Sequence, residues 1–259
     1  MNKALHLHLR GLHTIFAAIC FLGGLFLASH PASAADFQVS PIMLDLGQNV
    51  KSGVFNVINA SQEKLDLQIS VSEWTQDAEG KDVYTDTSDL IFFPKIMTME
   101  AGEQRVIRVG MKGPQQPQEK TYRIFIEQIP ERKKGTGVNI AVSFRFAPPI
   151  FVNPAVVKTE GAIDTIQLSN GKIKAIVKNT GTVHFKILSI FIKGKAADGS
   201  EVFSKELGGW YLLNHIARTI EAPVPPEKCA ELSTVEIEAR TENFNLNGRL
   251  NVQKGMCSQ

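Results

Sequence analysis

Residues 65–72 read LDLQISVS, and apolar and polar side chains alternate along them without a break. Successive side chains of a β-strand point to opposite faces of a sheet, so this pattern predicts a strand with one buried face. Trp74 falls on the opposite parity from Val71, which predicts a β-bulge near Glu73. The stretch therefore indicates a sheet that lays one face on a hydrophobic core.

Similar short segments recur on both sides of this stretch, separated by turn signals such as 77–80, 113–114 and 169–171. Helix signals are few. Many short strands with regular turns are typical of β-sandwiches, and an immunoglobulin-like domain takes about 100 residues. The sequence thus predicts an all-β protein of two tandem immunoglobulin-like β-sandwich domains at a fixed angle, boomerang-shaped. The predicted strands are 36–46, 53–59, 65–72, 104–110, 121–129, 138–152, 172–179, 184–193, 216–222, 232–240 and 246–254.

The first 34 residues predict a secretory signal peptide. Lys3 and Arg10 stand in a start without acidic residues, an apolar run covers 11–29, and the small residues Ala32-Ser33-Ala34 follow. A membrane anchor is the alternative, but the small-residue site and the polar sequence after it favour cleavage. No second apolar run is long enough to span a membrane, so we expect no stable membrane insertion after cleavage.

Cleavage after Ala34 would remove Lys3 and Arg10, and the 28 basic residues would become 26 against 26 acidic residues. A formal charge of zero does not suggest a nucleic-acid-binding protein, which needs a basic surplus. The 259 residues less the leader of 34 leave 225, enough for two ordinary domains. We expect the first domain at 35–153 and the second at 154–259.

Signatures of enzymes are missing from the sequence, among them G-x-S-x-G, the phosphate-binding loop, H-E-x-x-H and C-x-x-C. Only His184 and His215 lie outside the predicted leader, in separate segments. A structural or surface role suits each of them better than that of a general base. We therefore expect no catalytic residue, no metal site and no cofactor.

Residues 143–154 read SFRFAPPIFVNP, an apolar stretch with Pro148 and Pro149 at its centre. Proline has no N–H for a sheet ladder, so the stretch cannot be an ordinary inner strand. Upstream of the two prolines, Ile140, Val142, Phe144 and Phe146 alternate with polar or small residues and would share one face. The stretch therefore predicts an edge strand, whose pairing lapses at the two prolines.

These features together carry a family resemblance. Tyr122-Arg123-Ile124-Phe125-Ile126-Glu127-Gln128-Ile129-Pro130 is preceded by Gly102-Glu103-Gln104-Arg105-Val106-Ile107-Arg108-Val109 and followed by the strand that ends at Asn153-Pro154. The openings Phe37-Gln38-Val39-Ser40-Pro41 and Asn56-Val57-Ile58-Asn59 fit as well. The sequence resembles the PapD-like periplasmic chaperones of chaperone–usher pilus assembly, closely over the first domain and in outline over the second.

The resemblance implies a function without catalysis. Such chaperones bind pilin-like secreted subunits in the periplasm by donor-strand complementation and deliver them to an outer-membrane usher, without ATP. Main-chain hydrogen bonds of an added strand give affinity, and its alternate side chains fill pockets. The donor residues would be Ile140, Val142, Phe144 and Phe146. The alternative for this face is packing in the protein's own core, and the alternative function is a structural or adhesive immunoglobulin-like surface protein without strand donation.

The better-known branch of the family holds the carboxylate at the subunit's C-terminus with an Arg and a Lys, at places where this sequence has Met43 and Pro149. Arg123 is the best remaining cation, because a guanidinium can donate two parallel hydrogen bonds to a carboxylate. A Tyr-Arg pair like Tyr122-Arg123 resembles the archaic branch, in which that Arg is the anchor. Arg108 and Arg145 are reserves, and a solvated or interdomain ion pair is the alternative role of Arg123.

Two further features concern the domain join and the second domain. Gln128 and Asn153 replace a charged pair of the better-known branch, so we expect amide contacts between them at the join. Cys229 and Cys257 flank a predicted hairpin, 232–240 with 246–254, and the expected register brings them near each other with an offset of one residue. A disulfide between them is expected, with free thiols as the alternative.

Overall fold

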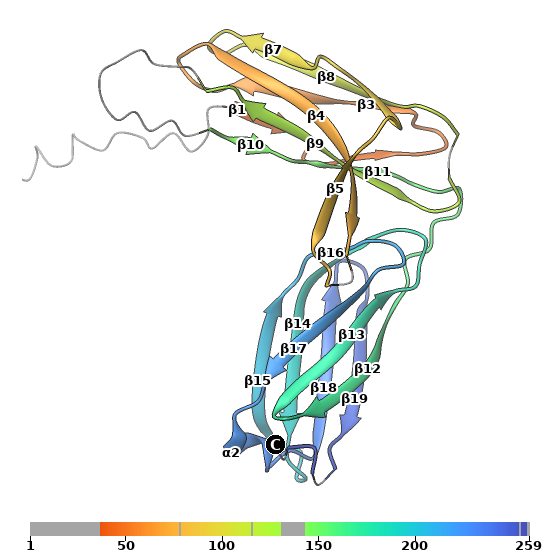
Figure 1. Cartoon of the computed structure of the whole chain (residues 1–259), viewed down its shortest axis with the longest axis vertical. Helices are drawn as coiled ribbons and strands as arrows, with labels where there is room; N and C mark the ends of the chain where they lie inside the picture. The colour runs from red at the N-terminus through yellow and green to blue at the C-terminus, as the bar shows by residue number, and fades with distance from the viewer. Residues whose placement is uncertain (1–36, 78, 115, 131–142, 254, 258–259) are drawn as a thin grey trace, which may run out of the picture. The chain divides into compact units, whose positions relative to one another are not determined.

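The computed structural model describes residues 37–77, 79–114, 116–130, 143–253 and 255–257 (Figure 1). The predicted leader, 1–34, and the donor residues Ile140 and Val142 lie outside the described residues. The described chain is almost entirely β-structure, as predicted, and Phe37–Gln259 form one compact unit.

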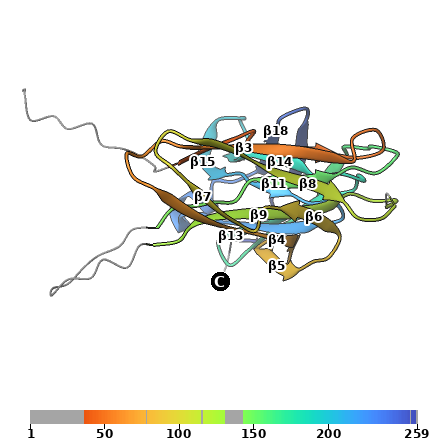
Figure 2. The ribbon, with the colours of Figure 1, turned by 90° about the horizontal axis from the view of Figure 1, so that it is seen from above.

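Two sheets form the N-terminal sandwich. One has the strand order β1-β3-β8-β6, and the other has the order β2-β11-β9-β4-β5, with β10 also paired to β9 and β7 to β4. Figure 2 shows β3 beside β8 in one layer and β4 beside β9 in the other. The strands are β1 Phe37–Ser40, β2 Leu44–Leu46, β3 Ser52–Asn59, β4 Leu65–Gln76, β5 Asp82–Asp86, β6 Leu90–Phe93, β7 Ile96–Met99, β8 Gln104–Met111, β9 Lys120–Gln128, β10 Arg145–Phe146 and β11 Pro149–Val152.

The core of this sandwich follows the alternation in the sequence. Leu65, Leu67 and Ile69 of β4 are buried against Ile124 and Ile126 of the neighbouring strand β9. Each fully buried aliphatic side chain stabilises the fold by about 1.5–3 kcal/mol. The period-two pattern of 65–72 thus places one face of β4 in the core.

The bulge predicted near Glu73 is wrong. The register of β4 with β9 runs from Leu67–Gln128 to Glu73–Tyr122 without a shift. Trp74 is buried on the opposite face from Val71, because it packs in a separate apolar cluster with Phe151 and Leu213. The change of parity marks a change of packing partner and not an extra residue in the strand.

The predicted strand 36–46 is two strands in the structure. β1 pairs with β3 in one sheet and β2 pairs with β11 in the other, so the chain passes between the sheets around Pro41. A proline cannot donate to a ladder, and this position suits such a crossing. The sequence also failed to indicate six strands, because they are brief, as are β5, β6, β7 and β16, or have few buried side chains, as do β12 and β15.

The C-terminal sandwich likewise has two sheets, of order β12-β13-β17 and β15-β14-β18-β19, with β16 paired to β14. Its core includes Ile173, Val177, Ile192, Val235 and Ile237, all nearly inaccessible to solvent. Its elements are β12 Gly161–Ser169, β13 Lys172–Asn179, β14 Phe185–Lys195, β15 Glu201–Gly208, β16 Tyr211–Leu212, β17 Ala217–Pro223, the helix α2 Pro226–Cys229, β18 Thr234–Thr241 and β19 Asn245–Asn251.

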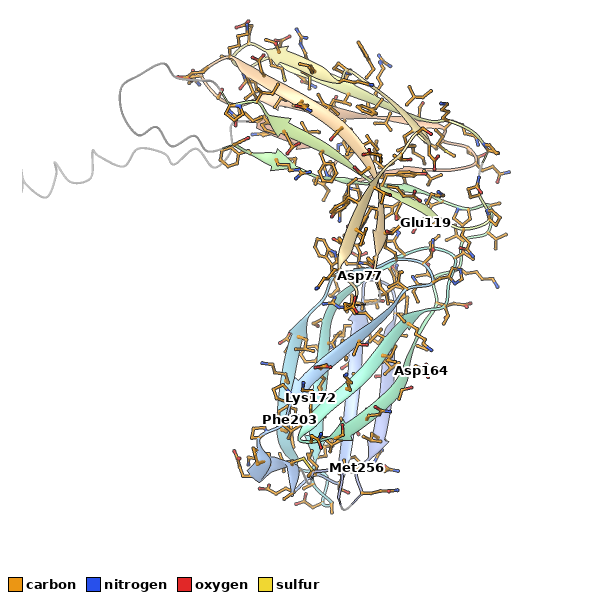
Figure 3. The ribbon with its side chains drawn as sticks, viewed as in Figure 1. Asp77, Glu119, Asp164, Lys172, Phe203 and Met256 are labelled. Carbon is orange, nitrogen blue, oxygen red and sulfur yellow. A yellow bond between two sulfur atoms is a disulfide. The ribbon has the colours of Figure 1, made fainter. Side chains whose placement is uncertain are left out.

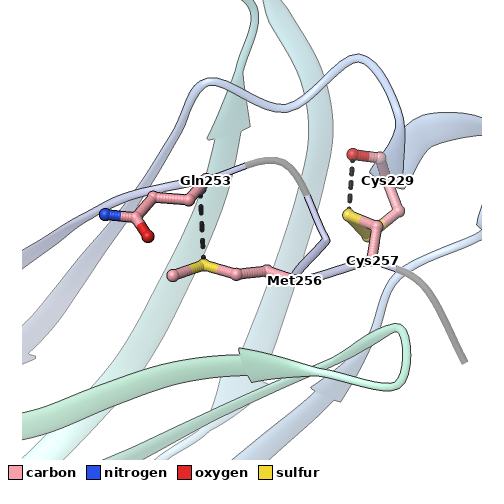
Figure 4. Close-up of a disulfide and its surroundings, with 4 residues drawn as sticks. All are labelled: Cys229, Gln253, Met256 and Cys257. Carbon is pink, nitrogen blue, oxygen red and sulfur yellow. Dashed lines mark hydrogen bonds between the residues drawn. A yellow bond between two sulfur atoms is a disulfide. The ribbon is translucent and has the colours of Figure 1, made fainter.

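Cys229 and Cys257 form the expected disulfide (Figure 4). Its setting differs from the expectation, because Cys229 ends the short helix α2 and does not extend the hairpin. The hairpin register pairs Val235 with Leu250. The bridge therefore ties the end of the chain to the turn before β18.

Candidate functional site

Arg123 lies on β9, where its backbone pairs with Ser72 of β4 on one side and with Pro149 of β11 on the other. The structure thus places Arg123 beside the proline-bearing stretch. Its neighbour Tyr122 points to the opposite face, is buried, and donates a 2.9 Å hydrogen bond to Asp89. Burial raises the pKa of Tyr122. β9 is therefore fixed on its core side while Arg123 faces the other way.

The guanidinium of Arg123 is enclosed although it is charged. The residue is only 7% exposed, and Cζ lies 3.9 Å from the ring centroid of Trp74. Trp210 and Tyr211, from the C-terminal sandwich, each lie 5.8 Å from Cζ. Aromatic faces attract a cation through the ring quadrupole, and the attraction grows as water is removed. One N–H, on Nη1, donates a 2.8 Å hydrogen bond to the carbonyl of Ala147.

This cation has no ion-pair partner within the part of the chain that the structure describes. No described carboxylate lies within ion-pairing distance of Arg123, which leaves the alternative of an interdomain ion pair without support among these residues. Its Nε is buried and has no acceptor. Burial lowers the pKa of Arg123, with the nearby Tyr84 hydroxyl and Asp82 carboxylate acting against this shift. A buried charge with an unsatisfied donor is costly, and an incoming carboxylate would satisfy both needs.

The two reserve cations stand in different surroundings. Arg145, on β10, is exposed, pairs with Glu127 at 3.2 Å and stacks on Phe125 at 4.0 Å. Arg108 is exposed on β8, which belongs to the other sheet. Met43 packs at the margin of the cluster of Trp74, Phe151 and Leu213. Of these positions, Arg123 alone combines burial with an open donor.

The hairpin of β4 and β5 supplies much of the surroundings of Arg123, and Figure 1 shows it reaching beyond the other strands of its sheet. The Gln76 side chain donates to the carbonyl of Tyr211 at 2.9 Å and accepts from the N–H of Leu213 at 3.1 Å. Asp82 accepts a hydrogen bond from Nε1 of Trp210 at 3.1 Å. These contacts join segments that lie more than 120 residues apart in the sequence.

The expectation of amide contacts between Gln128 and Asn153 is wrong. Gln128 ends β9, whereas Asn153 follows Val152, which pairs with Lys120 at the start of the same strand. At about 3.3 Å per residue, the two positions are roughly 25 Å apart. The side-chain amides that do join the sandwiches include that of Gln76 and that of Asn214, which donates to the carbonyl of Glu119 at 2.7 Å. The sequence carried no signal for Gln76 beyond its parity with Trp74.

A second polar contact reinforces the join. The fully buried carboxylate of Glu119, labelled in Figure 3, accepts from the backbone N–H of His184 and lies 2.8 Å from its Nδ1. The His184 ring stacks on Phe151 at 3.6 Å between centroids. His184 therefore has the structural role that the sequence analysis preferred.

The stretch after residue 142 divides at the prolines, as predicted, but only its first part is the expected edge strand, and the expectation that 149–152 cannot be an inner strand is wrong. β10 pairs with β9 and with no other described strand, so this part is a sheet edge, whereas β11 lies between β9 and β2. Phe144 and Phe146 are half-buried and pack at the margin of the core, and the Phe146 ring lies 4.9 Å from that of Phe37. Here the two side chains partly cover their own sandwich.

Other kinds of site are not apparent in the described ranges. Their His, Cys, Asp and Glu side chains make no group of three that could hold a metal ion. In the same ranges, no helix has the length and apolar character needed to cross a membrane. The enclosed guanidinium with its open donor is therefore the candidate site.

Residues 36–158 match the family described as the PapD N-terminal domain of pili and flagellar-assembly chaperones. Over 128 residues, the chain is 26% identical to a probable fimbrial chaperone, EcpE, of Escherichia coli O157:H7 and to its counterpart in strain K12. This alignment covers 48% of the chain, which spans about half the length (49%) of these curated relatives.

Two solved structures share the fold over most of the chain. The CsuC–CsuE complex, a chaperone–tip adhesion subunit pre-assembly complex of archaic Csu pili of Acinetobacter baumannii, matches with a TM-score of 0.59 at 17% identity, covering 82% of this chain and 98% of that one. The class 5 fimbriae chaperone CfaA matches with a TM-score of 0.55 at 19% identity, covering 84% and 99%. The described fold is thus that of two immunoglobulin-like sandwiches.

Proposed function

We propose that this protein, whose residues 36–158 belong to the PapD N-terminal domain family of pili and flagellar-assembly chaperones, is a periplasmic chaperone of pilus subunits. It binds and stabilises pilin-like secreted subunits by donor-strand complementation and delivers them to an outer-membrane usher. It is not an enzyme and uses no cofactor. The domain bounds 35–153 and 154–259 and the leader at 1–34 stay predictions.

One observation carries this proposal, namely the guanidinium of Arg123, which is buried and has a free Nε donor. A surface that is only structural gains nothing from burying a cation without a carboxylate to pair with it, because such burial costs free energy. A chaperone that receives a chain end gains a site ready for a carboxylate. We assign Arg123 the role of anchor for the carboxylate at the subunit's C-terminus.

In this proposal the donor strand would continue along the sheet edge that β10 forms beside β9. With Arg123 opposite Pro149, a guest strand fixed there by its last residue would lie beside 138–147 and bring alternate side chains to Ile140, Val142, Phe144 and Phe146. The edge position of β10 supports this arrangement, since its second side has no described partner. Three or four such side chains would contribute on the order of 5–12 kcal/mol before the cost of association.

The function is tested by isolating the tagged protein from the periplasm and identifying what it carries. We expect a one-to-one complex with a secreted pilin-like subunit, which should be lost or degraded in cells that lack this protein. A structural or adhesive surface protein would instead be found in the assembled structure, and its absence would leave other subunits intact. That second result would contradict the chaperone role.

We predict that Phe144→Asp weakens subunit capture by at least tenfold, because it places a charge in an apolar pocket of the guest. Phe144 is half-buried at an edge, so the variant should still fold, and circular dichroism checks this. Ser143→Asp is the matched control, since Ser143 is exposed and has the opposite parity. Equal capture by a folded Phe144→Asp variant would remove Phe144 from the donor face.

A further inference from the structure

Two half-exposed aromatic side chains stand beside Arg123, and the anchoring of a carboxylate does not require them. Tyr84 is 43% exposed on β5, and Trp210 is 42% exposed just before β16. Large aromatic side chains are costly to leave in water, and they are enriched where proteins bind partners. Because they lie at the only candidate site that the described residues form, we consider them candidates for contact with the ligand of that site.

Both side chains are fixed by the same carboxylate. The Tyr84 hydroxyl donates to one oxygen of Asp82 at 3.3 Å, and Nε1 of Trp210 donates to the same oxygen at 3.1 Å. The Tyr84 ring also packs edge-on against Phe125 at 5.3 Å, and the Trp210 ring against Tyr211 at 5.5 Å. Because their polar ends are held in this way, the parts that remain available are apolar ring surfaces.

The rings lie within reach of a residue held at Arg123. The Trp210 centroid is 5.8 Å from Cζ of Arg123, and Tyr84 is joined to Trp210 through the Asp82 oxygen that both side chains donate to. The side chain of a residue whose own carboxylate meets the guanidinium would extend roughly 4–6 Å from that carboxylate. It would therefore arrive among these rings, while Trp74 is fully buried and unavailable.

We propose that Tyr84 and Trp210 form a clamp that recognises the last side chain of the guest subunit and prefers a flat aromatic one. This inference rests on the proposed function, and it adds the chemical identity of the ligand: a free C-terminal carboxylate on an aromatic residue. Aromatic pairs gain energy beyond their buried area, and pinned rings lose little entropy on binding. Asp82, between the two rings, disfavours an acidic last residue.

The chain has two tryptophans, Trp74 and Trp210, and both contact Arg123, so their fluorescence reports binding at this site. The probes are three acetylated synthetic peptides: Gly-Gly-Ser-Tyr with a free carboxylate, the same peptide with a terminal amide, and Gly-Gly-Ser-Ala with a free carboxylate. We expect the tyrosine acid to bind about tenfold more tightly than the alanine acid, and the amide to bind far more weakly than either.

Substitutions of Trp210 test whether this residue causes the preference for a tyrosine at the end of the peptide. Trp210→Ala should remove most of the preference for tyrosine over alanine, whereas Trp210→Phe, which keeps a ring but loses the N–H, should retain it. In both variants Trp74 serves as the remaining fluorophore. Leu188→Ala changes another half-exposed apolar residue of the same sandwich and should have no effect.

The outcomes separate the clamp from the anchor. Equal binding of the tyrosine and alanine acids overturns the clamp and leaves the anchor standing. A tyrosine preference that persists in the amide, or in Arg123→Ala, contradicts the anchor alone. If none of the peptides binds at millimolar concentration, both assignments are wrong.

Discussion

Arg123→Ala should abolish the capture of a subunit by an otherwise folded protein. Truncating one partner of a buried, hydrogen-bonded charge pair costs about 2–5 kcal/mol, which lowers affinity by roughly 30-fold to several thousand-fold. Arg123 would lose two parallel hydrogen bonds to the guest carboxylate, and Lys cannot replace them because it lacks the planar fork. Arg123→Lys should therefore capture weakly, between Ala and the natural residue. Affinity is measured by titration with a purified subunit kept unfolded until mixing.

Arg145→Ala is the matched control for this experiment. Arg145 lies one strand away and stacks on Phe125 at 4.0 Å, much as Arg123 stacks on Trp74 at 3.9 Å, but it is exposed and already paired with Glu127. Its loss should change capture little. Arg123→Ala should fold, because it removes the cost of burying a charge together with one carbonyl contact and the contacts with three aromatic rings. Undiminished capture by Arg123→Ala would rule out the anchor.

Breaking the disulfide should destabilise the protein by about 3.5 kcal/mol. The bridge between Cys229 and Cys257 closes a loop with a sequence separation of 28, and its removal frees the unfolded chain by an amount that grows with loop length. For a chain of this size, we expect the melting temperature to fall by roughly 10 °C. The comparison is calorimetry of the double variant Cys229→Ala, Cys257→Ala against the natural protein.

The natural protein under reducing conditions provides the control for the cavity that alanine leaves at Cys229, which is buried in the core of the C-terminal sandwich. Reduction and substitution should lower the melting temperature by similar amounts. A double variant that melts at the natural temperature would show that the bridge contributes nothing to stability. Subunit capture below the melting transition should be unchanged, since the bridge lies outside the residues assigned to the site.

Local patterns in the sequence predicted the strands of the fold, but they misled where a strand changes the residues against which it packs. The alternation of 65–72 and of 235–240 located strands, because a half-buried strand repeats every two residues. The same logic interpreted the parity change at Trp74 as a bulge. In the structure the strand is regular and Trp74 meets a second apolar cluster, which no local pattern describes.

The sequence predicted only part of the candidate site around Arg123. Its central residue, Arg123, stood out as a cation in an apolar strand, and two prolines drew attention to the stretch that pairs with it. The contacts expected of Gln128 and Asn153 failed, because the family analogy gave no distance between them. The joining residues Gln76 and Glu119 went unnoticed, since polar residues near a strand end or a turn carry no distinctive signal.

The sequence by itself determined that this chain is an all-β protein with two sandwiches, and that an edge strand ends at two prolines. Those properties depend on the periodicity of the side chains and on the missing N–H of proline. Both signals are local, because they can be read from residues that are neighbours in the sequence. Only the tertiary structure decided that Arg123 is buried without a described carboxylate, against Trp74 and near Trp210. Burial and charge pairing depend on which distant segments of the chain come into contact. Here they bring Arg123 of the first sandwich against Trp74 of the same sandwich and near Trp210 of the second.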